Sequence, residues 1–280
     1  MSPRGRGRLS LARTLAPLVP FIWRWNSWRA SGRKLAIFMD TTQLIVGGVS
    51  ALSIGFSKCG LPGTGILVVP LMAWAFPAKE SVGVLTPMLI VGDLFAVAFY
   101  RRHAQWNKLW NLFPAVVAGM AVAAWLLGRV DNEQMKPILG WLVLALLALD
   151  LIRQKLGWEH VPHHPAFVGV MGFLGGFATT MGNVAGPVMT IYFLARGLDK
   201  NAFIGTFAWF FLIVNVAKVP LYFYLGMTTF GSLQFNLWMV PLVAVGAFTG
   251  RWLLPRVSQE LFTALILLTA AIAAARLIIP

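Results

Sequence analysis

Long runs of apolar residues fill the chain after Asp40, and charges, prolines and glycines mark the breaks between them. A helix needs about 20 apolar residues to cross a bilayer, and most of these runs are long enough. Only 11% of the residues are charged, whereas a soluble domain carries about 25%. The sequence therefore predicts an all-α polytopic membrane protein. The predicted segments are 41–57, 62–76, 81–100, 108–128, 135–152, 166–181, 185–197, 202–225, 233–255 and 260–279.

Two of these segments, 62–76 and 185–197, are shorter than a typical membrane-spanning helix, and each follows a glycine-rich break. Pro62 is suited to the first position of a new helix. Asn183 is predicted to cap the second short helix, with Gly182 permitting the turn. Short, interrupted segments at corresponding places in a chain indicate the binding site of a transporter.

The segments correspond because the chain repeats itself. An offset of 121 residues takes Gly55-Phe56 to Gly176-Phe177, an offset of 122 takes Asp93 to Asn215, and an offset of 127 takes Gly119 to Gly246. Two homologous halves are therefore predicted, with about eight full spans and the two broken pairs as helical hairpins. The predicted divisions are a basic extension at 1–40, a first repeat at 41–152, a polar linker at 153–165 and a second repeat at 166–280.

The relative orientation of the halves is predicted from the charges of two equivalent loops. The loop from Arg101 to Lys108 is strongly basic, whereas its counterpart at 226–234 has no charge. The positive-inside rule then places these loops on opposite faces of the membrane, which favours inverted repeats. Whether the halves are parallel or inverted also depends on how the broken pairs are counted as spans. The basic N-terminus conflicts with some span counts that give inverted repeats, so no terminal topology is predicted.

The basic residues are concentrated in the extension, since eight of the 23 Lys and Arg precede Asp40 and no acidic residue does. Next to a membrane body, such a flank is predicted to contact anionic lipids rather than nucleic acid. Residues 9–25 suit an interfacial amphipathic helix. An organellar presequence remains open, and a cleaved signal peptide is less favoured because no clean apolar core follows the arginines.

The two breaks are predicted to form an anion site, because helix N-termini inside the protein present unpaired N–H groups and partial positive charge. Lys58 adds a full charge, which in a membrane normally faces a cavity or a partner. The alternatives are that the glycines only let helices pack closely and that Lys58 reaches an interface. The candidate substrate-binding residues are Lys58, Cys59, Gly60, Gly63, Thr64, Gly65, Thr179, Thr180, Gly182, Asn183 and Gly186.

Four further residues are candidates for coupling or gating: Asp93, Asn215, Lys218 and Tyr222. Asp93 is predicted to take a proton, to pair with Lys58 or Lys218, or to coordinate a cation, and a purely structural ion pair is the alternative. Lys218 is either a second contact to the anion or a lysine that snorkels from a helix end. Tyr222 and Tyr100 are interpreted as aromatic anchors at the membrane interface in preference to a role in the site.

Neither a cofactor nor a metal site is predicted. The single cysteine, Cys59, excludes an intrachain disulfide, and it is interpreted as a small residue in a tight turn rather than as a reactive thiolate. His160, His163 and His164 lie in the linker without a completing acidic or cysteine ligand. No catalytic set of nucleophile and base is present, so the chain is predicted not to be an enzyme.

The glycine-rich hairpin that begins each half, the following turns at Lys79 and Lys200, and the duplication over residues 41–279 resemble the TauE/SafE family of membrane permeases. This resemblance implies transport of sulfite, sulfoacetate or related organosulfonates across a bacterial inner membrane. Cys59 and Asn183 stand where many members have further glycines, which leaves the substrate open. A transporter of another small anion, a non-transporting membrane subunit and a membrane-embedded enzyme remain alternatives, and a homo-oligomer is compatible with the sequence.

Overall fold

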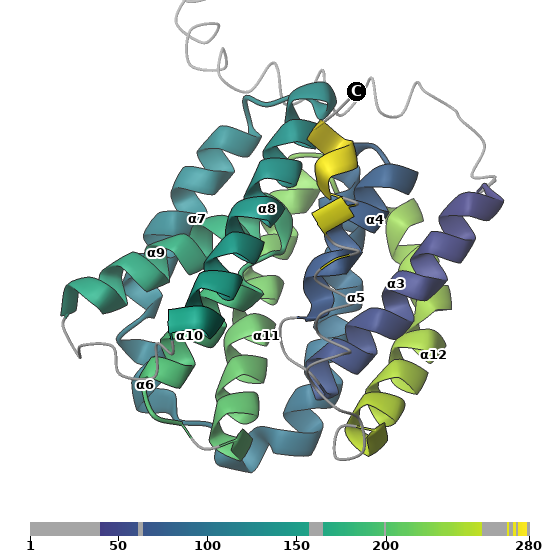
Figure 1. Ribbon diagram of the computed structural model, residues 1–280. Helices are drawn as coiled ribbons and strands as arrows, with labels where there is room; N and C mark the ends of the chain where they lie inside the picture. The colour runs from purple at the N-terminus through teal and green to yellow at the C-terminus, as the bar shows by residue number, and fades with distance from the viewer. Residues whose placement is uncertain are drawn as a thin grey trace, which may run out of the picture. The chain divides into compact units, whose positions relative to one another are not determined.

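Every regular element is helical in the part of the chain that the computed structural model describes, which is residues 40–60, 64–156, 165–198, 200–253, 268, 271–272 and 274–278. The elements are drawn in Figure 1. They are α3 (Thr41–Cys59), η1 (Thr64–Leu67), α4 (Val68–Ala75), α5 (Ala78–Tyr100), η2 (Arg101–His103), α6 (Trp106–Trp110), α7 (Phe113–Leu127), α8 (Asn132–Leu156), α9 (Pro165–Gly182), α10 (Gly186–Ala195), α11 (Lys200–Tyr224) and α12 (Phe230–Leu253).

Five helical stretches in the described residues are long and apolar enough to cross a membrane: Ala78–His103, Asn132–Ile152, Pro165–Gly182, Asn201–Tyr224 and Phe230–Leu253. Shorter apolar helices cover Gly65–Ala75, Phe113–Leu127 and Gly186–Ala195. The predicted all-helical membrane class is confirmed, whereas the eight spans and the inverted orientation stay predictions. The predicted extension, apart from Asp40, the linker histidines and most of segment 260–279 lie outside the described residues.

Two close helix pairs join the first helix of each sequence half to a later helix of the other half. α3 packs along α12, and α9 packs along α7 (Figure 1). A Cβ on Gly55 would run into the backbone oxygen of Val243, and a Cβ on Gly176 would run into that of Val116. Small residues let helix backbones approach in this way in membranes. The offsets of 121 and 127 residues convert the first of these contacts into the second.

α5 contacts α11, α12 and α3, and its proline helps to position the turn after α11. Pro87 has no N–H to donate to Gly83, four residues earlier, so the Gly83 carbonyl is free for another donor. The hydroxyl of Thr228 donates to this oxygen over 3.0 Å. A missing hydrogen bond within one helix therefore becomes a contact between α5 and the turn that precedes α12.

Lys79, at the start of α5, caps the C-terminal end of α7. Its Nζ donates to the backbone oxygens of Leu127 and Val130, each over 2.8 Å. We expect Lys79→Met to lower the free energy of unfolding by about 2 kcal/mol, because two carbonyls at a helix C-terminus lose a cationic donor. Thermal melting in detergent measures the loss. Lys136→Met is the matched control, since Lys136 is paired with the exposed Glu133 and this substitution is expected to change stability little.

Candidate functional site

Residues at both chain breaks line one cavity. The first separates α3, which ends at Cys59, from η1, which starts at Thr64. The hydroxyl of Ser57 accepts a hydrogen bond of 2.9 Å from the backbone N–H of Gly65 and so ties the two sides of this break together. The predicted helix start at Pro62 lies outside the described residues, as does Gly63, and nothing is described of the Thr64 side chain.

The second break turns at Asn183, not at Gly182. Gly182 is the last residue of α9, whereas Asn183 has a φ of 58°, in the left-handed region that Asn tolerates better than most residues. α10 begins at Gly186, and the position before it is Ala185. The prediction of Asn183 as a helix cap is therefore wrong. Its side chain instead donates to the Val82 oxygen over 2.9 Å and accepts from Lys218 over 2.6 Å.

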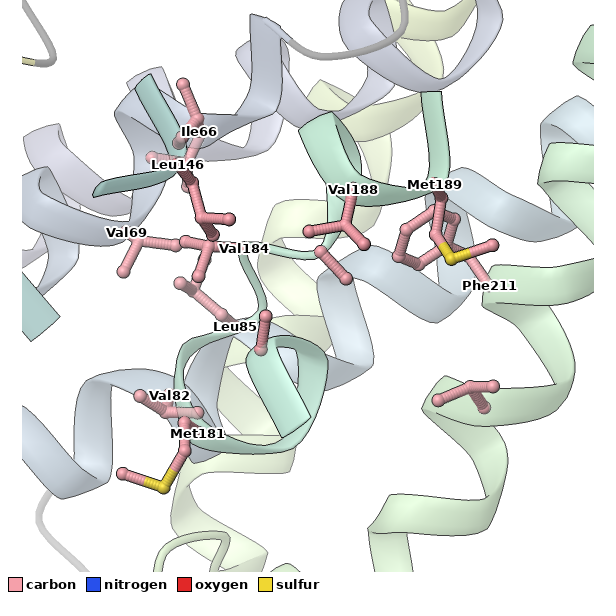
Figure 2. Close-up of a cluster of buried hydrophobic side chains, with 14 of the residues drawn as sticks. Ile66, Val69, Val82, Leu85, Leu146, Met181, Val184, Val188, Met189 and Phe211 are labelled. Atoms are coloured by element: carbon pink, nitrogen blue, oxygen red, sulfur yellow. The ribbon is translucent and has the colours of Figure 1, made fainter. Parts of the chain in front are cut away.

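The cavity has a volume of about 50 Å³. Its lining comes from α3, η1, α5, α9, the second break, α10 and α11. The lining residues are Ser57, Lys58, Gly65, Ile66, Leu89, Thr179, Asn183, Val184, Gly186, Pro187, Phe207, Phe211 and Asn215. Figure 2 shows Val184, from the second break, among the side chains of Ile66, Val69 and Leu85. The predicted residues Lys58, Gly65, Thr179, Asn183, Gly186 and Asn215 are thus brought together.

Lys58 is the one charged side chain among the described residues that line this cavity. Its Nζ lies 2.7 Å from Oδ1 of Asp93 and 4.2 Å from the ring centroid of Phe211. Oδ2 of Asp93 accepts a hydrogen bond of 2.7 Å from Nδ2 of Asn215. One carboxylate oxygen is therefore in ion-pair contact with Lys58 and the other is hydrogen-bonded to Asn215, and the predicted pairing of Asp93 with Lys58 is confirmed.

Lys218 lies behind the lining residues and is fully buried. Its Nζ donates to the carbonyl and hydroxyl oxygens of Thr179, each over 2.9 Å, as well as to Oδ1 of Asn183. The alternative that Lys218 snorkels to the membrane surface is therefore wrong. Because the Thr179 hydroxyl oxygen accepts from Lys218, its hydrogen points elsewhere and is available as a donor.

Several predicted residues do not line the cavity. Cys59 and Thr180 are buried, Gly60 packs against the backbone of Gly250, and Gly182 faces Leu139. Tyr222 is also fully buried, and its hydroxyl donates to the Thr180 oxygen over 2.8 Å. The preferred interpretation of Tyr222 as an interfacial anchor is wrong, because a tyrosine in such a belt keeps its hydroxyl in the wet interface.

The sequence reasoning missed two aromatic lining residues, Phe207 and Phe211. They precede Asn215 at intervals of four residues and therefore share one face of α11. Phe211 provides the face of a ring to the ammonium of Lys58, a favourable contact for a cation. This spacing upstream of Asn215 was the available signal.

Asn183 offers a test of how the second break is held. We expect the free energy of unfolding of Asn183→Ala to be about 1 kcal/mol lower than that of Asn183→Gly. Both variants lose the side-chain hydrogen bonds, but a positive φ is sterically unfavourable for Ala and not for Gly. Unfolding curves of the two purified variants measure the difference. Equal stability would contradict the left-handed conformation at this residue.

The described residues contain no group of three or more His, Cys, Asp or Glu side chains that is able to hold a metal ion. A family model described as sulfite exporter TauE/SafE matches residues 45–277. Neither a curated protein nor a solved structure matches the chain. The family match covers most of the chain and includes both breaks, all of α3 after its first turn and every described helix from α4 to α12. The chain is therefore an integral membrane protein of the sulfite exporter TauE/SafE family.

Proposed function

We propose that this protein moves small sulfur oxyanions, sulfite or organosulfonates of the sulfoacetate type, across a bacterial inner membrane. The observation that carries the proposal is a cavity between two broken helices whose one charged lining residue, among those described, is Lys58. A buried cation at a small cavity in a membrane protein marks an ion pathway. The family match supports a sulfite or related anion as its cargo.

The charges around the cavity favour an anion over a cation. Lys58 and Lys218 are two cations, and Asp93 is the one carboxylate that contacts either of them among the described residues. The hydroxyl of Thr179 and the N-terminus of α10 at Gly186 add donors at the same cavity. A sulfite or sulfonate group has three oxygens that accept hydrogen bonds, so this set of donors suits it.

We further propose that the two halves expose the cavity to one face of the membrane at a time. The repeated contact pattern, α3 with α12 and α9 with α7, supports two structurally related units, and each of these helix pairs is expected to move as one piece because its backbones are in close contact. Inverted repeats are the arrangement that makes the two exposed states equivalent in structure.

The test is flux of radiolabelled sulfite and sulfoacetate in liposomes that contain the purified protein. We expect saturable flux that protein-free liposomes lack and that an excess of either unlabelled anion inhibits. Flux of neither anion, together with a different anion that stabilises the protein against heating, would replace the substrate and keep the transporter. Absence of both flux and ligand would favour a non-transporting membrane subunit.

A further inference from the structure

The ion pair at the cavity is exposed on one side only. Lys58 keeps 10% of its side-chain surface exposed, whereas Asp93 has none and does not line the cavity. Asp93 therefore stands behind Lys58 as seen from the cavity. An anion that entered the cavity would meet the lysine and not the carboxylate.

The carboxylate of Asp93 is fully engaged by this chain. One oxygen is paired with Lys58, and the other accepts from Asn215. An ammonium in contact with one oxygen and an amide N–H on the other suit an ionised carboxylate. A carried proton would remove the negative charge that faces the Lys58 ammonium at 2.7 Å, so the geometry favours a fixed negative charge over a proton carrier at Asp93.

A lysine without a counter-ion is costly in a low-dielectric interior. While an anion is bound, the anion supplies the compensating charge. After release, the protein has to expose the empty cavity to the first face of the membrane again. During this step the charge of Lys58 needs another partner. Lys218 is a second cation, and its three acceptors are neutral oxygens of Thr179 and Asn183, so it offers no compensation.

We propose that Asp93 is the resident counter-ion that lets the empty carrier return. The anion shares Lys58 while it is bound, and Asp93 alone compensates Lys58 when the cavity is empty. This inference rests on the proposed transport of a small anion. Asp93 is thereby a positioning residue for the return step, and it does not itself contact the substrate.

Asp93→Asn tests the inference in liposomes through two modes of transport. In exchange, labelled sulfite moves against saturating unlabelled sulfite, so an anion occupies the cavity each time the exposed face changes. In net flux, the opposite side starts without any sulfite, so the cavity is empty when it is exposed again to the first face. We expect Asp93→Asn to lower net flux by about tenfold or more, because an uncompensated lysine opposes the return, and to keep exchange within about twofold of wild type. The concentration of sulfite at half-maximal exchange is expected to fall, because Asp93 no longer competes for Lys58.

The controls separate charge from shape. Asp93→Glu keeps the charge and is expected to restore net flux to within about threefold of wild type. Asp93→Ser replaces Asp93→Asn if the latter does not elute as a single species, and the same ratio of net flux to exchange is expected. Equal loss of both modes in a folded neutral variant, or no loss in either mode, would overturn the inference. Loss of net flux in Asp93→Glu as severe as in Asp93→Asn would also overturn it. Absence of both modes in the wild type would instead reject the proposed function.

Discussion

The double variant K58Q/D93N is expected to exchange sulfite about a hundredfold more slowly than the single variant D93N. The double variant avoids leaving Asp93 as an unpaired buried carboxylate. Lys58 is the one charged side chain among the described residues lining the cavity, and its largely buried ammonium lies over the ring of Phe211. A charged hydrogen bond to an anion is worth most where water is excluded.

The measurement is the initial rate of sulfite exchange in liposomes with equal amounts of each variant. Lys58→Arg in the wild-type background keeps the charge and is expected to retain more activity than K58Q/D93N. Lys136→Met controls for the loss of a lysine away from the cavity, since Lys136 lies at the surface beside Glu133. Exchange by K58Q/D93N at the rate of D93N would show that Lys58 does not hold the anion.

Alanine at Gly55 or at Gly176 is expected to destabilise the fold by about 3 kcal/mol or more. In each case the added Cβ meets a backbone carbonyl, of Val243 or of Val116, that belongs to a rigid helix. The two helices would have to separate, because a backbone oxygen is unable to rotate away as a side chain does. The two variants are expected to lose similar stability, since their contacts lie at corresponding positions of the two sequence halves.

The measurement is the melting temperature in detergent together with the fraction that elutes as a single species. Gly169→Ala is the matched control, because nothing lies within 4 Å of a Cβ at that position of α9. That substitution is expected to raise stability by up to about 1 kcal/mol, since Ala is the better helix former. A melting temperature of Gly55→Ala or Gly176→Ala equal to that of Gly169→Ala would contradict the close helix contacts.

Much of the helical architecture was predictable from the sequence because water is absent from the bilayer core. An apolar segment of sufficient length has to satisfy its backbone groups internally, and a helix does so. The predicted segment 81–100 accordingly appears as α5 at 78–100, and 233–255 as α12 at 230–253. The predicted segment 108–128 is instead divided between α6 and α7, at Asn111 and Leu112.

The candidate site was predictable in its location and only partly in its members. The glycine-rich breaks and Lys58 are visible as residues that conflict with a continuous apolar helix. The roles of Tyr222 and Lys218 were not visible, because each lies near the end of a long apolar segment where an interfacial position is equally natural. Both are fully buried, one donating to Thr180 and the other to Thr179 and Asn183.

The sequence by itself determined the membrane class, the helical segments, the two breaks and the offsets that relate Gly55 to Gly176 and Asp93 to Asn215. Only the tertiary structure decided that Lys58 pairs with Asp93, that Asn183 holds the second break, and that Phe207 and Phe211 line the cavity. The physical reason is that lipid and protein interior are both apolar. Hydropathy therefore identifies a helix that enters the membrane but does not reveal which of its faces turns inward.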